Sequence, residues 1–262
     1  MIETAAVPAY PWFQITGFRF RWPVIPAIVA AAILMQGMLV PGRELARWLF
    51  KSDPQVFHHQ VWAFLCLAEV FQFATGLIAV LLLHRLLPQA QTHFRWPRKA
   101  GYWWLAAVMG LAFAAIMLLA DYWPQLFMHQ PFPDQGYEIT AVGVPGWLIG
   151  MFGAGPNEEL IFRSFLVGLL GVFVPGRVRA GSFEVSLAGV VVALLFAAAH
   201  YQSFFVGPLA MALAQQTYAV AWAILYVWLM ERANSVVAPM LAHGLSDAME
   251  VGAVMALMTL ER

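Results

Sequence analysis

In this chain of 262 residues, 62% of the side chains are hydrophobic, 11% are charged, and the mean hydropathy is +0.73. Such a composition excludes an ordinary soluble domain, in which about a quarter of residues are charged, and predicts a membrane protein with several spans. The 14 basic and 14 acidic residues balance without forming long runs, so we expect membrane lipid as a partner and no nucleic acid. The only cysteine, Cys66, excludes an intrachain disulfide.

The hydrophobic runs are bounded by proline, glycine and charged residues, and they predict spanning helices in chain order. A membrane-spanning helix needs roughly 20 apolar residues, so the chain has room for about seven. The expected fold is an all-α, multi-pass transmembrane bundle whose first span stays as an anchor. The expected spans are 23–40, 56–84, 101–121, 144–174, 184–200, 207–230 and 235–258.

Two segments predict departures from simple spans. Residues 43–51 alternate basic and apolar side chains at helical spacing, which is typical of a short helix lying in the membrane interface. The fourth run carries Gly150, Gly153, Gly155 and Pro156 at its middle, so we expect a break there and a new helix starting at Pro156. That helix would place its first acidic residues near a positive helix end.

Loop charges predict the orientation of the bundle. The segment 85–99 holds four basic residues, whereas 121–140 holds three acidic residues and no Lys or Arg. By the positive-inside rule, the first segment belongs inside the cell and the second outside. Arg43, Arg47 and Lys51 would then lie outside, against the rule.

Three charged residues interrupt the fourth span: Glu158, Glu159 and Arg163. An ionised side chain at the bilayer centre costs roughly 2.5 to 3.5 kcal/mol, so each needs a structural or chemical role. Residues four apart share a helix face, which predicts an ion pair between Glu159 and Arg163 and leaves Glu158 free as an acid or base. The alternative is that all three form a buried polar clamp between helices.

Two later spans carry histidines. His200 closes an apolar helix, and Phe196 lies one turn back on the same face. In the last span His243, Asp247 and Glu250 form one polar stripe, which must face the bundle interior. An interhelical hydrogen-bond network is the alternative to a catalytic or proton-transfer site. Glu69, Gln215 and Gln216 are expected to make interhelical hydrogen bonds.

Together these residues offer the parts for peptide hydrolysis. A base must take a proton from water, and fixed donors must meet the carbonyl oxygen as it becomes negative. The same side chains are also a ligand set that zinc accepts, so a metal is a candidate cofactor. The set consists of Glu158, His200, His243 and Asp247.

Three motifs in order resemble the CPBP family of CAAX prenyl proteases of the second type and their bacterial relatives. They are Glu158-Glu159-x-x-x-Arg163, Phe196-x-x-x-His200 and His243-x-x-x-Asp247, with Ala238-Pro239 before the last. The resemblance covers about residues 145–255. It implies a four-helix catalytic core within 141–262, preceded by accessory spanning helices and an interfacial helix within 1–140.

The resemblance further implies an intramembrane endopeptidase in a bacterial plasma membrane, acting on a protein or peptide substrate. Glu158 and His200 would activate water, while His243 and residue 247 would stabilise the oxyanion. CAAX-processing members have Asn at that last position, whereas this chain has Asp247, which accepts hydrogen bonds when ionised and does not donate them. The rival functions are a proton- or ion-coupled transporter or channel and a non-catalytic immunity or scaffold protein.

Overall fold

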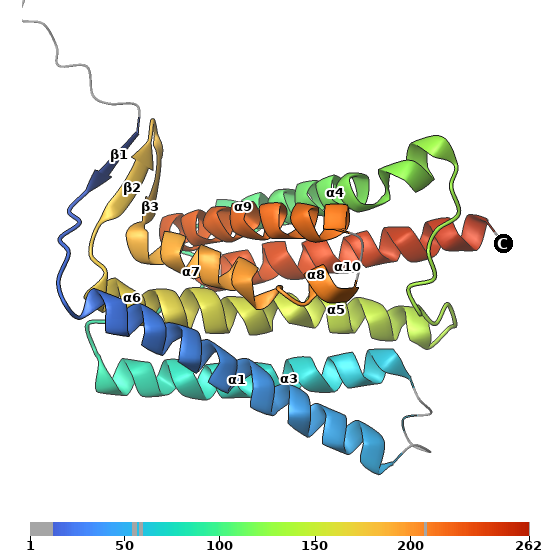
Figure 1. Ribbon diagram of the computed structural model, residues 1–262, viewed down its shortest axis with the longest axis horizontal. Helices are drawn as coiled ribbons and strands as arrows, with labels where there is room; N and C mark the ends of the chain where they lie inside the picture. Colours follow the sequence, from blue (N-terminus) through green and yellow to red (C-terminus); the bar gives the residue numbers. More distant parts are fainter. Residues whose placement is uncertain (1–12, 54–56, 58–59, 207–208, 262) are drawn as a thin grey trace, which may run out of the picture.

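The computed structural model describes residues 13–53, 57, 60–206 and 209–261. The first twelve residues and the expected start of the second span at 56 lie outside the described residues. The described chain is mostly helical, and its long helices pack side by side in one bundle (Figure 1). The predicted helical bundle is confirmed.

The long helical segments of the described chain follow the predicted spans closely. The bounds are α1 Val24–Ser52, α3 Val61–Leu86, α4 Gly101–Met128, α5 Gly143–Glu159, η1 Leu160–Leu166, α6 Val167–Phe173, α7 Leu187–Ala199, α9 Leu209–Ala233 and α10 Val237–Leu260. Segments α5, η1 and α6 follow one another without a gap. A short helix, α8 (Ser203–Val206), lies between α7 and α9.

Five helical stretches among the described residues are long and apolar enough to cross a membrane. They are Val24–Ser52, Val61–Leu86, Gly101–Met128, Leu187–Phe205 and Leu209–Ala233. The chain is therefore an integral membrane protein. The segment α5–η1–α6 and helix α10 are not among the five, and these two carry the predicted acidic site residues Glu158 and Asp247.

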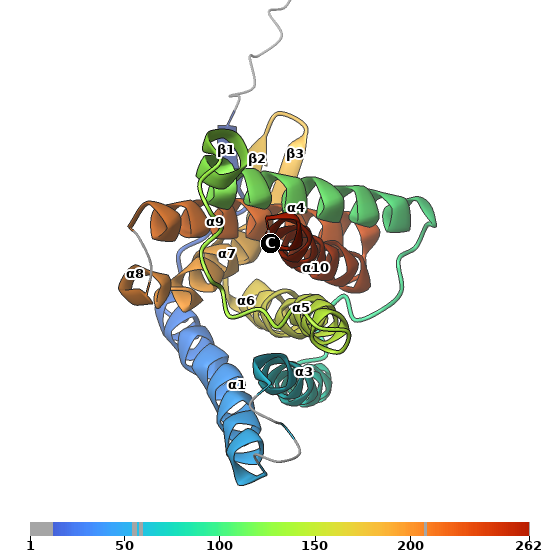
Figure 2. The same cartoon turned by 90° about the vertical axis from the view of Figure 1, so that its right-hand side faces the viewer.

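Helices α5 and α10 lie in the middle of the bundle when it is viewed end-on (Figure 2). Helix α10 packs along α5 on one side and α4 on the other, while α3 covers the opposite side of α5. The α5–α10 contact is close because glycines meet there: a Cβ on Gly155 would lie 2.2 Å from the backbone nitrogen of Gly244. Acidic residues on α5 and the polar stripe of α10 are thus brought face to face.

The expected interfacial helix at 43–51 is wrong. Helix α1 continues through Pro41 to Ser52, so these residues form its last third. Side chains of α3 supply hydrogen bonds beside the proline, because Gln72 donates to the carbonyl of Leu39 at 2.6 Å and Thr75 to that of Met38 at 3.2 Å. These bonds join α1 to α3 close to the proline.

The expected break between Gly150 and Pro156 is also wrong. Helix α5 runs through Pro156 and passes directly into the π-helix η1. The wider π turn changes the direction of the side chains without ending the helix. Glu158 and Glu159 therefore lie at the end of α5 and not at a positive helix start, so that electrostatic argument does not apply.

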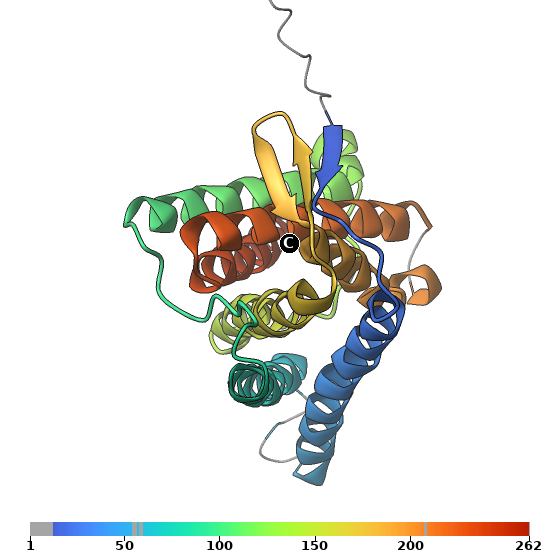
Figure 3. The same cartoon turned by 90° about the vertical axis from the view of Figure 1, so that its left-hand side faces the viewer.

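A small antiparallel sheet was not predicted. Strand β1 (Phe13–Thr16) pairs with β2 (Arg177–Ala180), which pairs with β3 (Phe183–Ser186) through a turn in which Gly181 has a φ of 60°. Helix α7 consequently begins at Leu187 and not at 184. Figure 3 shows this sheet at the end of the bundle from which α1 starts.

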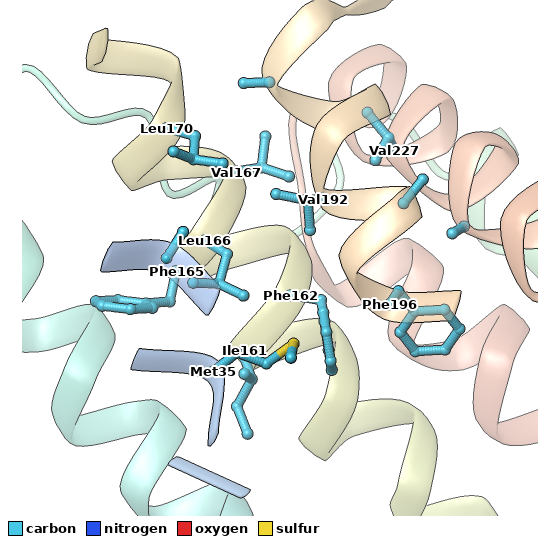
Figure 4. Packing of buried hydrophobic residues seen from close by; sticks show 14 of the residues in the cluster. Met35, Ile161, Phe162, Phe165, Leu166, Val167, Leu170, Val192, Phe196 and Val227 are labelled. Atoms are coloured by element: carbon cyan, nitrogen blue, oxygen red, sulfur yellow. The ribbon is translucent and has the colours of Figure 1, made fainter. Parts of the chain in front are cut away.

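Buried side chains from seven helical segments form the main core. Phe162 of η1 lies edge-to-face against Phe196 of α7, with ring centroids 4.9 Å apart (Figure 4). Met35 of α1 lies close to Ile161 in the same view. This core fixes η1 between α1 and α7, directly beside the polar residues.

The chain turns back between α7 and α9, and this turn lies short of the far ends of α5 and α10 (Figure 1). His200 forms the C-terminal boundary of α7, at the start of this reversal. The histidine is therefore placed within the bundle and not at its end.

Candidate active site

The two adjacent acidic residues of α5 have different environments. Glu159 is completely buried, and its Oε1 lies 3.2 Å from the guanidinium of Arg163. The predicted ion pair is confirmed. The side chain of Glu158 is 24% exposed and borders a cavity. Neighbouring helical residues point about 100° apart, which explains the difference.

The Arg163 guanidinium is held by Glu159 and by aromatic rings. Its central carbon lies 4.3 Å from the centroid of the Phe196 ring and 5.5 Å from that of Tyr226. Desolvated cation–π contacts contribute about 2 kcal/mol. No described residue accepts a well-aligned hydrogen bond from Arg163, so the ion pair and the rings are its compensation for burial.

His243 of α10 lies among three carboxylates. Its Nδ1 is 2.9 Å from Oε1 of Glu159, to which it donates, and its Nε2 is 3.4 Å from Asp247 and 3.7 Å from Glu158. The Tyr226 ring stacks on the imidazole with centroids 5.0 Å apart. One nitrogen is thus fixed by a buried carboxylate while the other faces the two partly exposed ones.

His200 is oriented by its own helix. Its Nδ1 lies 2.9 Å from the carbonyl oxygen of Phe196, to which it donates, and this bond leaves Nε2 unprotonated in the neutral ring. The Phe196 ring packs against the imidazole with centroids 4.8 Å apart. Gln216 donates to the His200 carbonyl at 3.2 Å, which joins α9 to this end of α7.

A cavity of about 260 Å³ brings the four predicted residues together. Glu158, His200, His243 and Asp247 all line it, and they come from α5, the end of α7 and α10. Glu250 lines it too, so the polar stripe of α10 faces the interior as predicted. Other polar lining residues, which the sequence had not indicated as site residues, are Tyr137, Gln215, Tyr218, Tyr226 and Ser246.

Tyr137 comes from the segment between α4 and α5, outside the spanning helices. Burial raises the pKa of Tyr137 to about 12. The phenol therefore stays neutral at physiological pH and is available as a hydrogen-bond donor at the cavity. Its aromatic character alone gives no sequence signal for this role.

A second cavity, of about 370 Å³, shares Glu158, His200 and Gln215 with the first. Its other walls come from α1, α3, η1 and the α7–α8 turn. The Glu158–His200 region is therefore reached from two sides of the bundle. A third cavity, of about 420 Å³, lies around Arg177 and shares no lining residue with these two.

A polar network between α3 and α5 holds Asn157, the residue that precedes Glu158. Asn157 is 1% exposed, and its amide donates to Glu69 at 2.7 Å and to Gln72 at 2.8 Å. Glu69 makes the interhelical bond expected of it and also lines the second cavity. The sequence did not indicate Asn157, although it directly precedes Glu158 in an apolar span.

The predicted residues do not form a metal site. Among the described residues, no three His, Cys, Asp or Glu side chains stand close enough to share one ion. The geometry of these described residues therefore does not fit zinc.

Residues 140–249 match the family model described as Type II CAAX prenyl endopeptidase Rce1-like. Over this region the chain is similar to the Rce1-like family. Comparison with curated proteins and with solved structures gave no significant match. The Rce1-like region holds all four predicted site residues, whereas α1, α3 and α4 precede it.

Proposed function

We propose that this protein is an intramembrane endopeptidase that hydrolyses a peptide bond close to the membrane surface. The proposal depends on one observation: a base, two imidazoles and a second carboxylate from three helical segments line one cavity in an otherwise apolar bundle. The match of residues 140–249 to a family of endopeptidases supports it. Residues 141–262 act as the catalytic core, and the preceding helices are accessory.

Glu158 and His200 together activate water. The Glu158 carboxylate takes a proton from water, and Nε2 of His200 accepts the second hydrogen bond that orients it. The hydroxide attacks the peptide carbonyl carbon, and Glu158 passes the proton to the departing amine. Nε2 of His200 is available for this role because Nδ1 donates to the Phe196 carbonyl.

His243 stabilises the oxyanion. Glu159 holds Nδ1, so a proton on Nε2 points toward the carbonyl oxygen of the substrate. Asp247, whose carboxylate lies 3.4 Å from Nε2, favours the charged imidazolium and orients it. In this scheme Asp247 supports His243 and does not itself donate to the oxyanion, which accounts for Asp where Asn would donate directly.

The site acts on a peptide or protein substrate within the membrane, and the family resemblance favours a bacterial plasma membrane. Glu158→Gln and His200→Ala should each lower turnover by about 100-fold or more, because each removes a group that handles the proton of the attacking water. Turnover is measured as shortened peptides, by comparative mass spectrometry of membranes from cells that make the wild type or Glu158→Gln.

Glu44→Gln is the matched control, since Glu44 is exposed and pairs with Arg47 on the outside of α1. Unchanged peptide processing in Glu158→Gln would contradict the proposal. Ion flux through liposomes that depends on Glu158 without any peptide cleavage would favour the transporter instead.

A further inference from the structure

The two cavities that meet at Glu158 and His200 differ in charge. The first is lined by Glu158, Asp247 and Glu250 and by no Lys or Arg among its described lining residues. The second is lined by Arg43 of α1 in addition to Glu69 and Glu158. A peptide whose scissile bond lies at Glu158 has room on both sides, with one flank in each cavity.

Arg43 is the one Lys or Arg that the described residues contribute to either cavity. It is half-buried on a helix apolar enough to span the membrane. Within the described part of the chain, Arg43 makes no ion pair or hydrogen bond, whereas Arg47, one turn further on, pairs with Glu44 on the exposed face. A guanidinium in such a setting is costly unless an anion meets it.

The two acidic neighbours of Arg43 have other contacts. Glu69 accepts the hydrogen bond from Asn157, and Glu158 faces His243 at 3.7 Å. Neither lies within ion-pair distance of Arg43. The guanidinium thus keeps its full set of donors for a group that enters the cavity.

We infer that the second cavity is a subsite for a carboxylate of the peptide substrate, and that Arg43 binds it. This inference rests on the proposed function, since it assigns specificity to the same site. A guanidinium fork matches the two oxygens of a carboxylate, which adds geometric selectivity to charge attraction. The carboxylate belongs either to the C-terminus of the substrate or to an Asp or Glu side chain beyond the scissile bond.

The test uses the full-length protein in liposomes with quenched-fluorescent decapeptide pools of randomised interior sequence. One pair of pools ends in a free carboxylate or in an amide, with no Asp or Glu inside. A second pair has amide ends and carries either Asp or Asn at one position. We expect the wild type to prefer one carboxylate-bearing pool by about tenfold in kcat/KM, the effect of one charged hydrogen bond. The pair of pools that shows the preference identifies whether the bound carboxylate is the C-terminus or an acidic side chain.

Arg43→Gln should abolish that preference, Arg43→Lys should retain part of it, and Arg47→Gln should leave it unchanged. A binding measurement separates recognition from turnover: Glu158→Gln should bind the preferred pool about tenfold more tightly than its partner, and Glu158→Gln with Arg43→Gln should not. Thermal unfolding checks that each variant is folded.

Cleavage that depends on Glu158 but shows no preference in either pair, or a preference that survives Arg43→Gln, would overturn the subsite alone. If no pool is cleaved in a manner that depends on Glu158, the proposed endopeptidase fails and the subsite with it.

Discussion

At the residue scale, Glu159 makes two contacts through the same carboxylate oxygen. It pairs with Arg163 on its own helix and accepts a hydrogen bond from His243 on α10. A helical pattern predicts the first contact, because both partners lie on one helix. The second depends on how α10 is placed against α5, which no local pattern contains. Glu159 is therefore a positioning residue as well as half of an ion pair.

We predict that removing one partner of this pair costs far more stability than removing both. Glu159→Gln or Arg163→Ala leaves an uncompensated buried charge and should lower the free energy of unfolding by about 3 to 5 kcal/mol. Glu159→Leu combined with Arg163→Met should restore most of that stability but not peptide cleavage, because His243 loses its anchor. Unfolding titrations in detergent and peptide turnover measure the two effects.

A double variant that recovers both stability and turnover would show that Glu159 only balances Arg163. Equal destabilisation by the single and double variants would contradict the ion pair as the origin of the cost.

At the element scale, the contact between α5 and α10 sets the distance between Glu158 and His243. The backbones approach closely at Gly155 and Gly244, since a Cβ on Gly244 would lie 2.6 Å from the carbonyl oxygen of Phe152. Small residues permit such close packing of membrane helices. Just beyond this contact the chain enters the π-helix, in which all residues from 160 to 166 are buried.

Gly155→Ala should therefore force α5 and α10 apart. Overpacking of this kind costs about 1 to 3 kcal/mol, and the shift should also lower peptide turnover. Gly171→Ala on α6 is the matched control, because an added Cβ there meets nothing within 4 Å. Thermal unfolding and turnover of both variants check the prediction, and equal behaviour of the two would contradict it.

At the scale of the whole molecule, the seven predicted helical segments could be derived from hydropathy, because span length is fixed by the membrane. The order of the three motifs likewise indicated Glu158, His200 and His243 as one group. Arg43, Glu69 and Asn157 could not be placed in this way. They reach the site only through the packing of α1 and α3 against α5, and single polar residues in apolar helices are more often interhelical hydrogen-bonders.

Basic residues gather at the end of the bundle that holds the sheet. The sheet carries Arg177 and Arg179, and Arg95 and Arg98 lie in the loop between α3 and α4, at the same end (Figure 3). The positive-inside rule assigns this end to the cell interior. The orientation stays a prediction, which accessibility labelling of single cysteines in Cys66→Ala would test.

The same loop gives a prediction for pH. Burial lowers the pKa of His93, and the amide of Asn234 donates to its Nδ1 at 2.8 Å while accepting from Arg98. The folded state therefore favours neutral His93, whereas the unfolded chain protonates it near pH 6.5. Stability should be intact above about pH 6.5 and fall as the pH drops below that value, because the unfolded state then binds more protons.

His93→Asn should flatten this pH dependence, since Asn tolerates the φ of 51° at this position and does not titrate. The measurement compares thermal unfolding of the wild type and His93→Asn at pH 8 and pH 5. His84→Asn at the end of α3 is the matched control, because it makes the same substitution at another histidine. An identical loss of stability in wild type and His93→Asn would remove His93 as the cause.

The small sheet also constrains the order in which the molecule can be assembled. Strand β1 precedes the first membrane helix, but its partner β2 is made only after α6. During synthesis, residues 13–16 must therefore wait without a strand partner while α1, α3, α4 and α5 are inserted. Their pairing with residues 177–180 then joins the start of the chain to the segment that follows Glu158, so a nascent chain that stops short of residue 180 lacks this closure.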